Sequence, residues 1–236
     1  MAKPISLNRN HQRNNNIALG IALLFHISGL IGLFTSARPW FIRHTPLNLW
    51  LMAILLLFTH HRRHAGFWLF AALAFVTGMV TEIVGINTGL LFGQYVYTPV
   101  LGLQYKGVPL LIGVNWLVIV YCCGTAMEIL QHRLARYYAA SGLVLPKRIQ
   151  TLSVIADGAL LAVLFDWVME PAAVKLGFWT WAADGEIPML NYGSWLVVSL
   201  LLLVLFRRLR VNCNNYFAIH LLIIEALFFL VIRTFL

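Results

Sequence analysis

Two carboxylic acids lie one helical turn apart inside a strongly apolar stretch of this chain. Asp166 and Glu170 both belong to the run 151–174, and positions i and i+4 share one face of a helix. A charged side chain at membrane depth costs roughly 2.5–3.5 kcal/mol on insertion scales, so a helix that carries two acids usually has a use for them. Neighbouring carboxyls can divide acid and base work, because one can stay protonated while the other ionises.

A third acid is expected at the same depth. A rise of ~1.5 Å per residue gives the height of each acid above the inner end of its run. Asp166 lies at about 22 Å, Glu82 at about 25 Å and Glu170 at about 28 Å. The three carboxyls should therefore meet in one layer toward the outer side. A structural alternative stays open, in which each acid hydrogen-bonds a neighbouring helix or pairs with a cation such as Lys175.

The other acids are assigned elsewhere. Asp157 is about 9 Å up its run and faces away from the pair, since nine residues at ~100° per residue give a roughly opposite direction. Glu225 is about 13 Å up the last run. We expect Glu128 to form a salt bridge near the inner surface, and Asp184 and Glu186 to lie in a solvated outer loop.

The elements that position these acids are those of an integral membrane protein. The chain has 236 residues, of which 61% are hydrophobic and 11% charged; a soluble domain is about 25% charged. Its length suits one membrane domain, 1–236, with a polar basic tail at 1–16. The net charge of +9 reflects Lys and Arg beside the apolar runs rather than nucleic-acid binding. The three cysteines form neither a disulfide framework nor a metal-binding pattern.

Seven apolar runs predict an all-α, polytopic helix bundle. A helix needs about 20 apolar residues to span a bilayer. The second and sixth runs are short, and we expect them to extend back to Pro46 and to begin near Pro188. The predicted spans are 17–35, 47–59, 65–84, 108–130, 151–174, 194–206 and 216–235.

The distribution of cations predicts the orientation. With seven spans, 12 Lys and Arg residues fall on the side of the N-terminus and 5 on the other side. The positive-inside rule then places the N-terminus in the cytoplasm and the C-terminus outside. We expect the membrane to be the cytoplasmic membrane of a bacterium.

The outer connections are too apolar for ordinary loops. Residues 85–107 carry one charge, and residues 177–193 are rich in aromatic residues. Irregular backbone at membrane depth must be buried in protein or line a cavity, so we expect re-entrant or interfacial segments that close a pocket. A Trp and Tyr interface belt is the alternative. Gly85, Gly89 and Gly93 have the spacing that permits close helix packing.

Acids, aromatic rings and an apolar cavity suit proton-driven chemistry on an isoprenoid. A buried acid protonates a carbon–carbon double bond, aromatic faces hold the tertiary cation, and a base orients and deprotonates the quenching water. We assign Asp166 as proton donor, with Glu82 or Glu170 handling water. Asn191 is a further candidate for substrate binding, and the candidates for holding the cation are Tyr95, Tyr97, Trp167, Trp179 and Trp181. No metal or cofactor pattern is present.

Three stretches also resemble a known family. TEIVGINTGLLFGQYVYT (81–98), the VP at 108–109 and FDWVMEPAAVKLGFWTWAADGEIPMLNYGSW (165–195) are similar to the carotenoid biosynthesis membrane proteins that include the carotenoid 1,2-hydratases of the CruF type. The resemblance covers about residues 65–206. It implies hydration of the terminal 1,2 double bond of an acyclic carotenoid end, on a substrate such as lycopene or γ-carotene. It implies no established catalytic residue.

Two other functions remain open at this point. An end-group cyclase shares the protonation step and differs only in how the cation is quenched. A proton-coupled transporter or a pigment-binding protein would also use intramembrane acids, although the halves show no clear inverted repeat. The expected partners are the carotenoid, the lipid bilayer and other enzymes of carotenoid biosynthesis.

Overall fold

The structure is a computed structural model that describes residues 9–182, 185–211 and 215–236. In these residues, seven helices are long and apolar enough to cross a membrane, which confirms the predicted all-α membrane bundle. The helices are α1 (Arg9–Leu33), α2 (Arg38–Thr59), α3 (Ala65–Thr88), α4 (Leu110–Ala140), α5 (Lys147–Lys175), α6 (Met189–Arg208) and α7 (Tyr216–Phe235).

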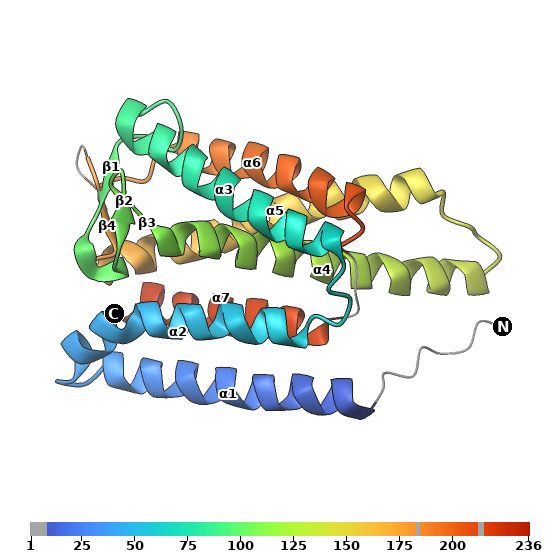
Figure 1. Cartoon of the computed structure of the whole chain (residues 1–236), viewed down its shortest axis with the longest axis horizontal. Coiled ribbons are helices and arrows are strands. Elements are labelled where there is room, and N and C mark those ends of the chain that lie inside the picture. Colours follow the sequence, from blue (N-terminus) through green and yellow to red (C-terminus); the bar gives the residue numbers. More distant parts are fainter. Residues whose placement is uncertain (1–8, 183–184, 212–214) are drawn as a thin grey trace.

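Helix α4 is the centre of the bundle. It contacts α2, α3, α5, α6 and α7, and 72% of its most apolar window is buried. Helix α1 lies at one edge of the bundle and packs on α2 and α7 (Figure 1). Helix α4 has 31 residues, about 46 Å at the α-helical rise, so its charged C-terminal turns extend beyond the hydrocarbon region.

Several predicted spans were too short. The seventh span is correct, and the sixth helix begins directly after Pro188 as expected. The second helix, predicted at 47–59, begins already at Arg38 and continues through Pro46. Side chains just before Pro46 hydrogen-bond to backbone carbonyls of the preceding turn. His44 Nδ1 bonds to the Trp40 carbonyl oxygen at 2.7 Å, and the Thr45 hydroxyl donates to the Phe41 carbonyl oxygen at 3.1 Å. Such side-chain bonds let a membrane helix tolerate proline.

Four short strands lie together at one end of the bundle (Figure 1). The antiparallel pairs are β1 (Tyr95–Tyr97) with β4 (Trp179–Trp181), and β2 (Gln104–Tyr105) with β3 (Val108–Pro109). A short 3₁₀ helix, η1 (Pro99–Leu101), separates β1 from β2. The two apolar outer segments therefore pair with each other, because β1 comes from 85–107 and β4 from 177–193.

Of Gly85, Gly89 and Gly93, only Gly85 lies in a helix, so the three do not form a helix-packing stripe. Gly85 does permit the predicted close packing, because a Cβ there would lie 2.8 Å from the Phe92 ring. Helix α3 ends at Thr88, and Gly89 and Gly93 adopt φ angles of 67° and 115°. Glycine adopts such left-handed angles without steric cost, so these two residues end the helix and turn the chain toward β1.

Candidate functional site

The predicted acids lie on two helices beside the β1–β4 pair. Glu82 lies near the end of α3, and Asp166 and Glu170 lie one turn apart on α5. All three side chains are buried. The predicted layer of acids is therefore present at the end of the bundle that carries the strands.

Three hydrogen-bond donors converge on Glu82. Its Oε2 accepts from the hydroxyls of Tyr95 and Tyr97, the latter at 2.7 Å, and its Oε1 accepts from Trp116 Nε1 at 3.0 Å. Both tyrosines reach it because residues two apart in a strand share one face. Burial and the neighbouring Glu82 raise the pKa of Tyr95 and Tyr97, so both hydroxyls keep their protons. This arrangement suits an ionised carboxylate.

Glu170 is bonded on one oxygen only. Its Oε2 accepts from Trp179 Nε1 at 3.0 Å and from Trp181 Nε1 at 3.1 Å. The indole N–H is a donor without acceptor capacity. Among the described residues nothing hydrogen-bonds the second oxygen, Oε1, which can therefore carry a proton.

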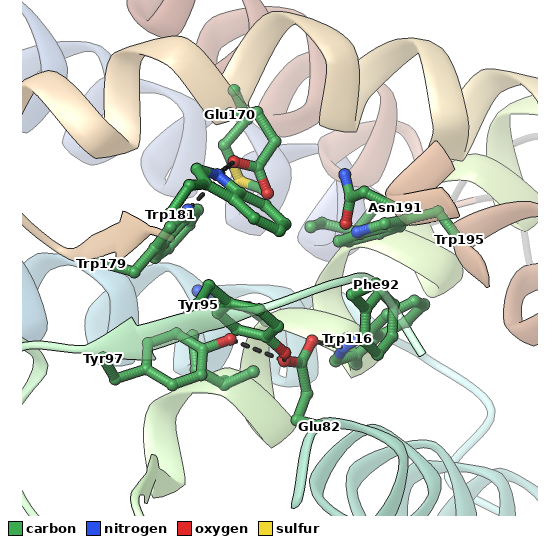
Figure 2. Close-up of a pocket in the computed structure, with 14 residues that line it drawn as sticks. Glu82, Phe92, Tyr95, Tyr97, Trp116, Glu170, Trp179, Trp181, Asn191 and Trp195 are labelled. Carbon is green, nitrogen blue, oxygen red and sulfur yellow. Dashed lines mark hydrogen bonds between the residues drawn. The ribbon is translucent and has the colours of Figure 1, made fainter. Parts of the chain in front are cut away.

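Strand pairing turns the four donors into one aromatic wall between the two acids. Tyr95 lies opposite Trp181 and Tyr97 opposite Trp179, with ring centroids 5.0 and 5.7 Å apart. Glu170 approaches this wall from α5 and Glu82 from α3 (Figure 2). The strand pair thus holds residues from two distant segments of the chain in one fixed arrangement.

A cavity of about 30 Å³ lies between the acids. Space for one water requires about 10–15 Å³ by this kind of measure, so the cavity accommodates water. The other walls are supplied mainly by Phe92, Trp116, Asn191 and Trp195 (Figure 2). Asn115 also lines the cavity. Water in this cavity has carboxyl and amide groups as hydrogen-bond partners.

Asp166 lies behind this cavity and not in its wall. It has no exposed surface, its Oδ2 accepts from Asn191 Nδ2 at 2.7 Å, and its Oδ1 has no hydrogen-bond partner among the described residues. Asn191 itself lines the cavity. The predicted residue thus belongs to the site, but Asn191 stands between it and any molecule in the cavity.

Trp167 is the one predicted aromatic residue that lies away from the others. It is half-exposed, its ring is covered by the Arg233 guanidinium at 3.9 Å, and its carbonyl accepts from the same arginine at 2.7 Å. Its position directly after Asp166 turns it about 100° from the face that carries the acids. Lys175, considered above as a partner for the acids, bonds instead to the Arg233 carbonyl at 2.8 Å.

Outside this site, the remaining acids follow the sequence assignments where the structure describes them. Glu128 forms its predicted salt bridge, with His132 at 3.0 Å and with Arg207. Asp157 is exposed beside Ser153 and Glu186 is exposed, whereas Asp184 lies outside the described residues. Glu225 is buried on α7. In the described part of the chain, no three His, Cys, Asp or Glu side chains gather as a metal site would require.

Comparison with known proteins places this architecture in a family. The profile of the carotenoid biosynthesis protein family matches residues 45–235. The chain belongs to that family.

One relative carries a more specific name. The chain of this carotenoid biosynthesis protein is 27% identical over 200 residues to bisanhydrobacterioruberin hydratase from Haloarcula japonica. The match covers 79% of this chain and 63% of the relative, so the chain spans less than two thirds of that protein. No solved structure matches the present chain.

Sequence reasoning missed several wall residues of this carotenoid biosynthesis protein. Trp116 of α4 and Trp195 of α6 stack with centroids 4.0 Å apart, and both line the cavity. They occur in ordinary apolar runs, where a tryptophan resembles any core residue. Asn115 offered a better signal, because an amide within an apolar span is unusual and calls for a polar neighbour.

Proposed function

We propose that this carotenoid biosynthesis protein hydrates the terminal 1,2 double bond of an acyclic carotenoid end group and forms a tertiary alcohol at C1. The observation that carries the proposal is a water-sized cavity between two buried acids, Glu82 and Glu170, joined by an aromatic wall. The family match and the hydratase name of the Haloarcula relative support the same reaction.

Glu170 is the proton donor in this proposal. Its Oε1 has no competing hydrogen bond among the described residues, whereas both oxygens of Glu82 accept bonds. The Oε1 proton adds to C2 of the alkene, and the π electrons form the new C–H bond. The positive charge then resides on C1, which bears two methyl groups. This choice differs from the sequence-based assignment of Asp166, which Asn191 separates from the cavity.

The aromatic wall and Glu82 complete the reaction. The faces of Trp179, Trp181 and Tyr95 stabilise the cation, as aromatic rings stabilise other cations. Water adds its lone pair to C1, and Glu82 accepts the proton that the water loses. Return of that proton to Glu170 restores the site, so the net reaction is addition of one water molecule to the alkene.

Asp166 acts as a positioning residue. Its bond to Asn191 Nδ2 fixes the amide, which leaves the Asn191 carbonyl oxygen to accept a hydrogen bond from water. The cavity as it stands accommodates water and is smaller than a dimethyl-substituted alkene end. Wall side chains such as Trp181 and Tyr95 must therefore shift when the substrate end arrives.

The direct test is expression of the full chain in cells that accumulate lycopene or γ-carotene. We expect new pigments heavier by one water per hydrated end, identified by liquid chromatography and mass spectrometry. A new pigment of unchanged mass would identify an end-group cyclase instead. Unaltered pigments in cells that contain the membrane-inserted protein would contradict the proposal and favour a transporter or a pigment-binding protein.

A further inference from the structure

A second cavity, much larger than the one between the acids, lies among α1, α2 and α7. It has a volume of about 460 Å³, against about 30 Å³ for the cavity between Glu82 and Glu170. Ligand pockets for small molecules usually measure about 300–1,000 Å³. Its walls come from α1, α2 and α7 and from the segment that follows α5.

A third cavity of about 30 Å³, called the passage below, lies between this large cavity and the candidate site. The passage and the site share four wall residues, Asn115, Ile119, Met169 and Trp179. The passage and the large cavity share four others, Leu49, Phe178, Glu225 and Phe229. The shared wall residues show that the three cavities follow one another in a row from the acids to α1.

The lining of the large cavity is mostly apolar, which suits a hydrocarbon; its polar members are His26, Ser28, His44, Thr45, Asn48 and Glu225. Its histidines direct their Nδ1 atoms to their own helices, His26 to the Ala22 carbonyl at 2.8 Å and His44 to the Trp40 carbonyl at 2.7 Å. Phe25, Trp40 and Leu47 at its rim are exposed on the outer surface of the bundle. This surface would face lipid, so an apolar molecule could reach the cavity from the bilayer.

We propose that the cavity between α1, α2 and α7 holds the polyene chain of the carotenoid whose end group reacts between Glu82 and Glu170. The inference rests on the proposed function, because it identifies where the unreactive part of the same substrate lies. A carotenoid is a long apolar chain, and only its end fits beside the acids. The remainder requires an apolar path that begins at the site, which is what the passage and the large cavity supply.

Filling the cavity tests this assignment. Gly29 on α1 lines it, and a Cβ there would lie 3.5 Å from the Phe228 ring, which is ordinary contact. Gly29→Leu is therefore expected to fold and to occupy space that the polyene needs. Gly20→Leu is the matched control, because Gly20 lies on the same helix with nothing within 4 Å of its Cβ. Thr45→Phe fills the cavity from α2, with exposed Ile54→Phe as its control.

The measurement is retained pigment, which does not depend on turnover. Each variant is made in a Glu170→Gln background and purified in detergent from lycopene-producing cells. Carotenoid per protein is read from visible absorption. We expect Gly29→Leu and Thr45→Phe to lower it by at least about tenfold, equivalent to 1.4 kcal/mol of binding free energy. Gly20→Leu and Ile54→Phe should retain the pigment of the Glu170→Gln parent. Size-exclusion profiles and thermal unfolding check that each variant folds.

The outcomes separate the two proposals. Equal pigment in all four variants would overturn the cavity assignment, and co-purified phospholipid in that case would assign the cavity to membrane lipid. Loss of pigment in the filled variants, with no hydrated product from the unmodified protein, would retain the cavity assignment and reject the hydration reaction. Loss of pigment in the control variants to the same extent would also overturn the assignment, because the effect would not depend on the cavity.

Discussion

Two buried glutamates of the same site differ in how their oxygens are bonded. Three donors satisfy both oxygens of Glu82, whereas two indoles satisfy a single oxygen of Glu170. A carboxylate with all its oxygens bonded is suited to remain an anion, and a carboxyl with one unbonded oxygen is suited to hold a proton. This asymmetry is the basis for assigning the base and the acid.

The order of variant effects along α5 tests that assignment. We expect Glu170→Gln to lower hydration by about 10²–10⁴-fold, the usual contribution of a general acid. Asp166→Asn should have a smaller effect, because it alters the support of Asn191 and leaves the proton donor in place. Rates of product formation in membranes measure both. Exposed Asp157→Asn on the same helix is the control, and a larger loss in Asp166→Asn than in Glu170→Gln would restore Asp166 as the donor.

At the scale of elements, the β1–β4 pair is what unites the site. The Thr98 N–H donates to the Phe178 carbonyl at 3.0 Å, and the Ala182 N–H donates to the Gln94 carbonyl at 2.9 Å. Hydrogen-bonded pairs recur every second residue in an antiparallel ladder, so Val96 and Thr180 form the pair between these two. Two strands of three residues thereby fix the direction of four aromatic side chains.

Removing one bond of this ladder should disable the site without unfolding the bundle. Thr180 is exposed, and Thr180→Pro eliminates its N–H while leaving every helix unchanged. We expect hydration to fall by on the order of 100-fold, since small displacements of positioning groups have effects of that size. Circular dichroism should report unchanged helix content. Thr180→Val keeps the N–H and should remain active, and full activity of the proline variant would refute a role for the strand pair.

At the scale of the whole molecule, the site occupies the end with fewer cations. The strands and the C-terminus lie together at that end, and α1 begins at the other (Figure 1). The 12-to-5 distribution of Lys and Arg predicts that this end lies outside the cytoplasm. The acids would then lie in the outer half of the bilayer.

Reporter fusions measure that orientation. Alkaline phosphatase joined after Leu236 should be active and green fluorescent protein at the same point should be dark, because each folds productively on one side only. The same reporters joined after Arg208 at the end of α6 should give the opposite result. An active phosphatase after Arg208 and an inactive one after Leu236 would show that the orientation is the reverse of the predicted one.

The sequence by itself determined the helix bundle and the depth of the acids. Apolar length marks each span, and a fixed rise per residue converts position into height, so Glu82, Asp166 and Glu170 could be assigned to one layer. Composition also distinguished the two apolar outer segments from ordinary loops.

Only the tertiary structure decided which acid faces the cavity. The direction of a side chain depends on how helices rotate against each other and on pairing between strands far apart in the chain, as between Tyr95 and Trp181, and neither leaves a local signal. Asp166 therefore proved to lie behind Asn191, and Trp167 to lie under Arg233. The row of cavities from the acids to α1 is likewise a product of packing, because their walls come from helices that are far apart in the chain.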